Sequence, residues 1–237
     1  MGNSPSLNQK TGQKAMAERV NNHNLIIADF GFRTGRVFAP LFPESAIFRN
    51  PSQINQNSVI VFEGGTDIDP GLYGEKRGSH TYIADWKRDD FENSLYRIGR
   101  RKGSAFIGIC RGAQLLTALN GGKLFQDVAG HGISHQIKTD TGKIMPTTSL
   151  HHQMMNPFML SQDAYKIVAW SLQPQSSYYD NGDDLTKEIP EVEPEVVWFP
   201  RTKSLCIQGH PEFAAEQSQF RQYCQALVRR FIINRDE

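Results

Sequence analysis

A cysteine between two glycines follows a short apolar run in this chain. Residues 108–114 read Gly-Ile-Cys-Arg-Gly-Ala-Gln; the run at 105–109 predicts a strand, and the periodic segment after Cys110 predicts a helix. This is the cysteine form of the nucleophile elbow, a sharp turn whose crowded neighbours favour glycine. The partial positive charge at a helix N-terminus favours thiolate over thiol. The pattern predicts a reactive cysteine, with a buried cysteine that only packs as the alternative.

The motif His210-Pro211-Glu212 follows a second apolar segment, 204–208, that reads as a buried strand. Imidazole titrates in the range that suits a base able to take a proton from a thiol and return it to a leaving group. Glu212 could orient that imidazole across the kink that Pro211 imposes. The cysteine and the histidine are distant in sequence, so only the fold can bring them together. Taken alone, the motif also fits an ordinary turn.

Paired glycines follow the apolar strand predicted at 59–62. The backbone N–H groups of Gly64 and Gly65 can face a ligand closely, because glycine has no Cβ. Acyl transfer needs such donors for the oxyanion, and the N–H of Arg111, directly after the cysteine, is a further one. The alternative is a turn in which nearby aspartates cap local N–H groups.

Together and in this order, the three segments resemble those of the class I glutamine amidotransferases. The chain is most similar to their γ-glutamyl hydrolase branch, of the peptidase C26 type, which includes γ-glutamyl-γ-aminobutyrate hydrolases. The resemblance covers roughly residues 25–232. It rests on the following motifs: Gly-Gly-x-Asp-Ile-x-Pro-x-x-Tyr-Gly (64–74), Arg-Asp-x-Phe-Glu (88–92), Gly-Ile-Cys-Arg-Gly-x-Gln (108–114), Gly-Gly-x-Leu-x-Gln-Asp (121–127), Ser-Leu-His-His-Gln (149–153) and Gly-His-Pro-Glu (209–212).

The resemblance implies roles for individual residues. It implies a catalytic triad of Cys110, His210 and Glu212, with the oxyanion near Gly64, Gly65 and the Arg111 backbone. It also implies residues close to the glutamyl moiety of the substrate, which are Gln114, Ser149, Leu150, His151 and His152. One departure lies beside the oxyanion loop, where Glu63 stands in the place of a proline found in many relatives.

Strands and helices alternate along the chain, and Cys110 lies at the carboxyl end of a strand. This predicts an α/β fold with a mostly parallel central sheet and helices on both faces. The resemblance implies the flavodoxin-like fold of class I glutamine amidotransferases. We expect a single catalytic domain over 25–237, preceded by an N-terminal extension, 1–24, that has no counterpart in the family pattern.

Local patterns predict several further elements. A helix is expected at 87–101, where acidic residues in the first turn and basic residues in the last complement the helix dipole. A second helix is expected at 220–232. Strands at 196–199 and 204–208 predict a hairpin leading to the histidine. Residues 174–195 are rich in Asp, Glu, Pro and Ser, which predicts an exposed acidic loop.

Composition excludes several classes of function. With 237 residues and a net charge of +1, the chain fits one enzyme domain and argues against nucleic acid or acidic membrane as a partner. Three cysteines without a close pair suit a reducing compartment. Neither a membrane-spanning run nor a signal-peptide pattern is found in the sequence. We therefore expect a cytoplasmic protein; homo-oligomerisation is left open.

The chain contains seven histidines, and four of them invite a metal-site interpretation. Histidine is a common zinc ligand, and the four that lie close in sequence are His131, His135, His151 and His152. Glycines on both sides of His131 make a helix at 131–135 unfavourable, so the helical reason for that spacing fails. A glutamyl pocket and the core both explain His151 and His152 without a metal. We expect no metal and no other cofactor.

The sequence leaves two functions in competition. The first is a self-sufficient hydrolase that cleaves a γ-glutamyl amide through a glutamyl-thioester on Cys110, releasing glutamate and an amine. The second is a glutaminase subunit that passes ammonia from glutamine to a separate synthetase or ligase, since the chain carries no P-loop of its own. Arg111 favours the hydrolase, because the resemblance associates an arginine directly after the nucleophile with the hydrolase branch. A catalytically dead binding module is disfavoured by the complete Cys-His-Glu set.

Overall fold

The computed structural model describes residues 23–28, 30, 33–47, 51–182 and 189–234. Its centre is one nine-stranded sheet. The strands, in spatial order, are β2 (Glu44–Ile47), β1 (Asn24–Ala28), β3 (Ser58–Phe62), β4 (Ala105–Ile109), β13 (Ser204–Ile207), β12 (Pro194–Phe199), β10 (Lys166–Ser171), β7 (Gln136–Thr139) and β8 (Ile144–Pro146). Most of the predicted 1–24 extension lies outside the described residues.

The sheet has a parallel half and an antiparallel half. Strands from β2 to β13 pair in parallel, and those from β13 to β8 pair antiparallel. The predicted α/β fold with its parallel sheet is confirmed, and β4 and β13, which precede Cys110 and His210, are neighbours within the parallel half. Parallel neighbours end at the same edge, so the two residues meet there.

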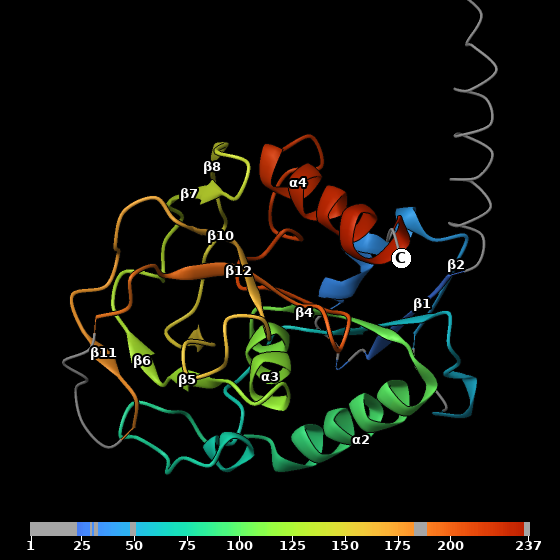
Figure 1. Cartoon of the computed structure of the whole chain (residues 1–237), viewed down its shortest axis with the longest axis horizontal. Coiled ribbons are helices and arrows are strands. Elements are labelled where there is room, and N and C mark those ends of the chain that lie inside the picture. The colour runs from blue at the N-terminus through green and yellow to red at the C-terminus, as the bar shows by residue number, and fades with distance from the viewer. Residues whose placement is uncertain (1–22, 29, 31–32, 48–50, 183–188, 235–237) are drawn as a thin grey trace, which may run out of the picture.

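Two hydrophobic cores lie on opposite faces of this sheet, because successive strand side chains point to opposite sides. Val59 and Val61 of β3 belong to one core, with apolar residues of helix α4 (Gln219–Val228) and of the 3₁₀ helix η1 (Thr34–Leu41). Ile60 and Phe62 belong to the other, with residues of α2 (Trp86–Lys102) and α3 (Arg111–Leu119). Figure 1 shows α4 on one side of the sheet and α2 and α3 on the other.

The two predicted long helices are present. α2 begins after Asp85, whose side chain accepts hydrogen bonds from two backbone N–H groups, and ends at Gly103 in the left-handed conformation. α4 continues as a π-helix, η4 (Arg229–Ile233). Two other short 3₁₀ helices occur among the described residues, η2 (Pro51–Gln53) and η3 (Pro70–Tyr73).

The expectation of an exposed acidic loop at 174–195 is wrong in part. β11 (Tyr179–Asp180) pairs with β6 (Asp127–Val128), and Glu193 and Glu195 are buried. Residues 183–188 lie outside the described residues. The composition misled because these acidic side chains find buried partners. A further small sheet joins β5 (Lys123–Phe125) to β9 (Met154–Asn156).

Within the part of the chain that the structure describes, no helix has the length and apolar character needed to cross a membrane.

Candidate active site

Cys110 occupies a strained turn between β4 and α3. Its backbone has φ 50° and ψ −110°, a combination that a non-glycine residue adopts only where its surroundings enforce it. The enforcing contacts are backbone hydrogen bonds from Cys110 N to Ile207 O (2.8 Å) and from Ala113 N to Cys110 O (2.9 Å). The predicted elbow is therefore present, with the thiol at the start of a helix.

Both glycines of the elbow are required by close packing. A Cβ on Gly112 would lie 2.1 Å from the carbonyl oxygen of Phe62, and a Cβ on Gly108 would lie 2.4 Å from Gly112. These separations are far below van der Waals contact, so any side chain would push α3 away from the sheet. The absence of a Cβ at both positions lets the helix start directly over β3 and β4.

His210 and Cys110 lie beside the same glycine. A Cβ placed on Gly64 would be 3.4 Å from His210 Cε1 and 3.8 Å from Cys110 Cβ. Glu212 contacts the other side of the imidazole, with its Oε1 at 2.6 Å from His210 Nδ1. His210 N also donates to Thr148 O (2.8 Å), which fixes the backbone of the motif. The structure thus brings the three predicted segments to one point.

The electrostatic surroundings of His210 favour its protonated form. Burial alone lowers the pKa of the imidazole, but hydrogen bonding and charge interactions with Cys110 and Glu212 outweigh it and raise the pKa to about 10. Phe213 stacks on the ring with centroids 4.7 Å apart, which limits its rotation. An imidazole held between a cysteine and a carboxylate is the arrangement that nucleophilic cysteine chemistry uses.

The side chain of Arg111 points away from the pocket. It is buried and donates to the carboxylates of Asp89 and Glu92 on α2. Only its backbone N–H, in the first turn of α3 where helical partners are lacking, belongs to the elbow. Gly65, with φ 146°, lines the pocket next to Cys110.

The same buried ions tie the glycine loop to the elbow. Arg88 donates to Glu92 (3.1 Å) and to the carbonyl oxygen of Glu63 (3.0 Å), and Asp89 accepts from the backbone N–H of Asp69 (2.8 Å). The acidic residues of this helix therefore do more than complement its dipole. The sequence interpretation missed this because it explained the charges of this helix by the helix dipole alone.

Glu63 is buried, and its carboxylate accepts a hydrogen bond from Gly35 N in η1 (2.9 Å). Glu63 therefore joins the glycine loop to the segment after β1. A proline at this position could not do so, because it has no polar side chain.

A pocket of about 340 Å³ opens beside Cys110. Of the residues expected near the substrate, four line it: Gln114, Leu150, His151 and His152. Ser149 does not, because its hydroxyl donates to the carbonyl oxygen of His131 (2.6 Å). Gln114 is held by a hydrogen bond from its amide to Gln153 O (3.0 Å), so one pocket wall is joined to the other.

Additional pocket residues come from the loop after β3 and from the segment before α2. Asp67 accepts from the backbone N–H of Tyr82 (2.8 Å) and contacts His152 Nε2 (3.1 Å). Asp127 contacts the other ring nitrogen of His152 (3.0 Å), and these hydrogen bonds raise the pKa of His152 against the opposing effect of burial. The sequence analysis treated the aspartates near the paired glycines, Asp67 among them, as possible turn caps. No sequence pattern pointed to Tyr82 as a pocket residue.

Known proteins similar to this chain indicate its family and its fold. The family model described as peptidase C26 matches residues 37–159. The chain belongs to the peptidase C26 family. It is 28% identical over 171 residues to the glutamine amidotransferase-like protein YvdE of Lactococcus lactis, covering 68% of each chain.

Solved structures share the fold of this peptidase C26 protein at low sequence identity. PurLQS from Thermotoga maritima aligns with a TM-score of 0.52 and 12% identity over 89% of this chain and 100% of that one. The glutaminase domain of CTPS from Trypanosoma brucei aligns with a TM-score of 0.50 and 12% identity over 88% and 93%. These likenesses establish the class I glutamine amidotransferase fold.

The other two cysteines of this peptidase C26 chain are packing residues. Cys206 and Cys224 are fully buried in the two cores. Burial raises the pKa of each thiol well above its usual value, which keeps both in the unreactive form.

The four clustered histidines separate into two environments. His151 and His152 line the pocket, and burial lowers the pKa of His151 to about 3, so its ring is neutral. His131 and His135 lie behind it, buried beside Glu195. As the flanking glycines indicated, no helix forms at 131–135.

Proposed function

We propose that this protein is a cysteine-dependent hydrolase that cleaves γ-glutamyl amides through a glutamyl-thioester on Cys110. The observation that carries the proposal is the convergence of Cys110, His210 and Gly64 at one end of the parallel strands. This supplies a thiol, a base held by a carboxylate, and backbone donors around one point beside a pocket.

In the proposed first half-reaction, His210 holds the proton that comes from the Cys110 thiol, and the sulfur of Cys110 attacks the amide carbonyl carbon. Backbone N–H groups of Gly64, Gly65 and Arg111 stabilise the oxyanion. The C–N bond breaks as the imidazolium gives its proton to the departing amine, which leaves a thioester. In the second half-reaction, His210 takes a proton from water as the oxygen attacks the thioester. The C–S bond breaks, the thiol recovers its proton, and glutamate leaves.

The pocket dimensions and lining support a glutamyl-sized acyl group. A volume of about 340 Å³ suits a small substrate. Polar groups from Gln114, His152 and Asp67 line a pocket whose other walls include Leu150 and Tyr82. We propose that these polar groups bind the α-amino and α-carboxyl groups of the glutamyl moiety and so place its γ-carbonyl carbon next to Cys110.

The buried ions favour a site that is complete in one chain. Arg111 and Arg88 connect α2, the elbow and the glycine loop through buried hydrogen bonds. A loop held in this way needs no partner to order it, which favours the self-sufficient hydrolase. The alternative remains a glutaminase subunit that requires a synthetase or ligase, a partner type that the class I fold also serves.

The deciding experiment measures glutamate release by the purified chain across a panel of γ-glutamyl amides of small amines, with glutamine included. We expect turnover without ATP or a second protein, with a γ-glutamyl conjugate preferred to glutamine because the amine half adds binding energy. Cys110→Ser should be inactive. An electrophilic glutamine analogue should label Cys110 and spare Cys206 and Cys224.

Inactivity on every conjugate, with glutamine hydrolysis appearing only when a ligase is added, would replace this proposal with the subunit. Labelling of another cysteine would displace Cys110 as the nucleophile.

A further inference from the structure

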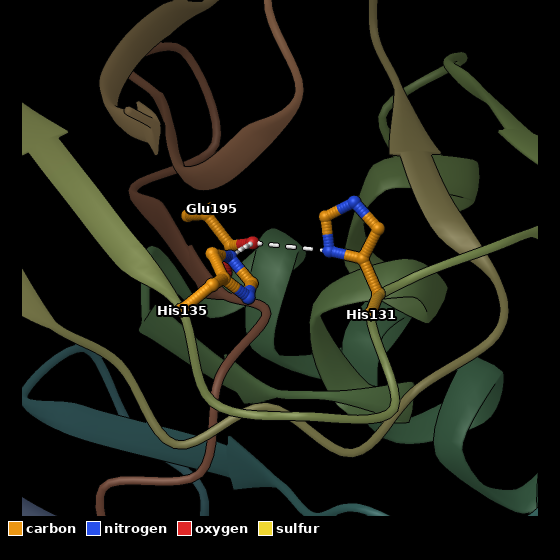
Figure 2. Close-up of side chains that lie close together, drawn as sticks. All are labelled: His131, His135 and Glu195. Carbon is orange, nitrogen blue, oxygen red and sulfur yellow. Dashed lines mark hydrogen bonds and ion pairs between the residues drawn. The ribbon is translucent and has the colours of Figure 1, made fainter. Parts of the chain in front are cut away.

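Three buried side chains with metal-binding atoms lie outside the proposed catalytic set. His131, His135 and Glu195 each offer a ligand atom, and these atoms all lie within 4.8 Å of one another (Figure 2). We propose that these three residues bind one divalent metal ion, Zn²⁺ by the chemistry of the ligands, as a structural site behind the wall of the pocket.

Rigid parts of the fold position the three ligands. Glu195 lies in β12 and His135 directly precedes β7, and both strands pair with β10. His131 lies in the turn after β6, where Gly130 has φ 79° and a Cβ would lie 2.4 Å from Gln175 O. The glycine that argued against a helix thus makes the tight turn that brings His131 to the strands.

In each histidine, the ring nitrogen that faces away from Glu195 has an oxygen close to it, as an ion-pair contact for His131 and as a hydrogen bond for His135. His131 Nε2 lies 3.2 Å from Glu193 Oε2 and His135 Nδ1 lies 3.2 Å from the carbonyl oxygen of Ile133. Their other nitrogens lie 3.4 Å and 2.8 Å from Glu195 Oε1. Metal-binding histidines usually give their second ring nitrogen to a carboxylate or a carbonyl in this manner.

Glu193 is itself firmly placed for this outer role. It accepts hydrogen bonds from the backbone N–H groups of Gln175 and Ser176 (2.8 Å each) and from the hydroxyl of Tyr179 (2.9 Å). A carboxylate so engaged can orient His131 without turning toward the metal.

Ion pairing alone leaves this cluster incompletely satisfied. Among the described residues, none makes a hydrogen bond of good geometry to Glu195 Oε2 or to either ring nitrogen of His131, although all three atoms are buried. Buried polar atoms are rarely left in this state. Metal ligation requires neutral imidazoles, so the two carboxylates, Glu193 and Glu195, would then leave two negative charges that a dication balances.

The spacing and the burial favour structural zinc. Ligand atoms about 2.0–2.1 Å from a tetrahedral Zn²⁺ stand about 3.3 Å apart. The 3.4 Å between His131 Nδ1 and Glu195 Oε1 fits directly, and the 2.8 Å pair needs to open slightly. The two histidine nitrogens lie within 4.8 Å of each other, and a bound ion would draw them closer together. Ser171 Oγ, 3.2 Å from His135 Nε2, lies beside these atoms and is the candidate for the fourth ligand position. All three ligands are buried, as in closed structural sites.

The site would stiffen the wall that carries the pocket histidines. The carbonyl oxygen of His131 accepts from Ser149 Oγ (2.6 Å) and from His151 N (3.2 Å). The rings of His131 and His151 lie 4.8 Å apart. A metal that fixes His131 therefore fixes the chain at Ser149 and His151, which also accounts for a serine that does not face the pocket.

The test is metal analysis of the untagged full chain after unfolding with a chelator and refolding with Zn²⁺ or Co²⁺, followed by desalting. We expect about one metal per chain, with the visible absorption of four-coordinate Co²⁺ and X-ray absorption showing imidazole ligands. His135→Gln and Glu195→Gln should lose the metal. Glu193→Gln should bind about 10–100-fold more weakly. His80→Gln, at an exposed histidine, is the matched control and should bind normally.

Refolded wild type without bound metal would overturn the proposal. So would equal metal in wild type, His135→Gln and Glu195→Gln, which would indicate surface binding. Because the readouts are metal content and spectra, they do not depend on the proposed γ-glutamyl hydrolase activity. The spectra of the wild type decide the matter even where a buried variant fails to fold.

Discussion

At the scale of single residues, the proposed chemistry depends on one imidazole with two different neighbours. His210 has Cys110 on one side and Glu212, 2.6 Å from its Nδ1, on the other. A base in this position both activates the thiol and protonates the leaving amine, whereas the carboxylate only orients and stabilises it. The two partners should therefore contribute unequally to turnover.

We expect His210→Ala to lower kcat for γ-glutamyl amide hydrolysis by at least about 10²–10⁴-fold, the usual contribution of general acid–base catalysis. Glu212→Gln keeps the shape of the side chain and removes its charge, so its loss should be smaller. Steady-state kinetics on both variants check this order. A Glu212→Gln variant slower than His210→Ala would require the roles to be reassigned.

The raised pKa of His210 links stability to pH. The pKa rises from about 6.5 in the unfolded chain to about 10 when folded. The proton is held more tightly in the folded state, so this stabilisation is complete below pH 6.5 and is lost as pH rises through 10. Between these values, the free energy of unfolding should fall by up to about 1.4 kcal/mol per pH unit.

Urea denaturation at several pH values from 7 to 10 measures that slope. His210→Gln removes the titrating group, so its slope should be clearly shallower than that of the wild type. Cys110→Ala removes one of the two partners that raise the pKa, and its slope should be intermediate. Equal slopes in all three proteins would contradict the ionic coupling.

At the scale of elements, one buried arginine joins a helix, the elbow and the glycine loop. Arg111 pairs with Asp89 and Glu92, and those carboxylates also bind Asp69 N and Arg88. Removing one partner of a buried ion pair is costly because the other charge is left without compensation. The planar guanidinium reaches two carboxylates at once, and an ammonium cannot reproduce this.

Arg111→Lys should therefore destabilise the protein by about 1–3 kcal/mol and lower turnover, since the glycine loop loses its anchor. The matched control is Arg230→Lys, at an exposed pair with Asp140, where exposed ion pairs predict a change below about 1 kcal/mol. Chemical denaturation and kcat of the two variants provide the comparison. Equal effects would show that the buried network is not what holds the loop.

Elements that depend on local pattern were predictable, and those that depend on distant pairing were not. The elbow follows from apolar residues, two glycines and a helical stripe within a short stretch around Cys110. β7 and β8 are short and make their contacts with β10 and with each other. Nothing in their sequences specifies that partner, so this part of the antiparallel half was missed, whereas the β12–β13 hairpin was predicted from local pattern.

The candidate site shows the same division. Cys110, His210 and Glu212 stand in motifs whose chemistry can be read from adjacent residues. The burial of Glu195 depends on His131 and His135, which come from another part of the chain. Sequence composition alone assigned that glutamate to an exposed acidic loop. A buried charge is stabilised here by partners that are distant in sequence, and local sequence patterns carry no information about those partners.

At the scale of the whole molecule, the two halves of the sheet share their cores. One core includes Val59 and Val61 of the parallel half together with Val168 and Ala169 of the antiparallel half. The other joins Ile60 of β3 to Val197 and Phe199 of β12. Neither half can keep its apolar surface buried without the other, so one domain over 25–237 remains our prediction.

We therefore expect one cooperative unfolding transition. Trp170 and Trp198 lie in β10 and β12 and report on the antiparallel half, whereas far-UV circular dichroism reports mainly on α2, α3 and α4. Trp86 is exposed, so Trp86→Phe removes its background fluorescence at little cost in stability. In that variant, the fluorescence and dichroism curves in urea should coincide, with equal midpoints and slopes.

Separate transitions would mean that the shared cores do not couple the halves. Loss of the tryptophan signal at lower urea, with the helical signal retained, would assign independent stability to the parallel half. The candidate catalytic residues all belong to segments that follow parallel strands, whereas Glu195 and His135 belong to the antiparallel side. With a split transition, bound zinc should stabilise only the antiparallel half. With one transition, bound zinc should raise the urea midpoints of the fluorescence and dichroism signals together.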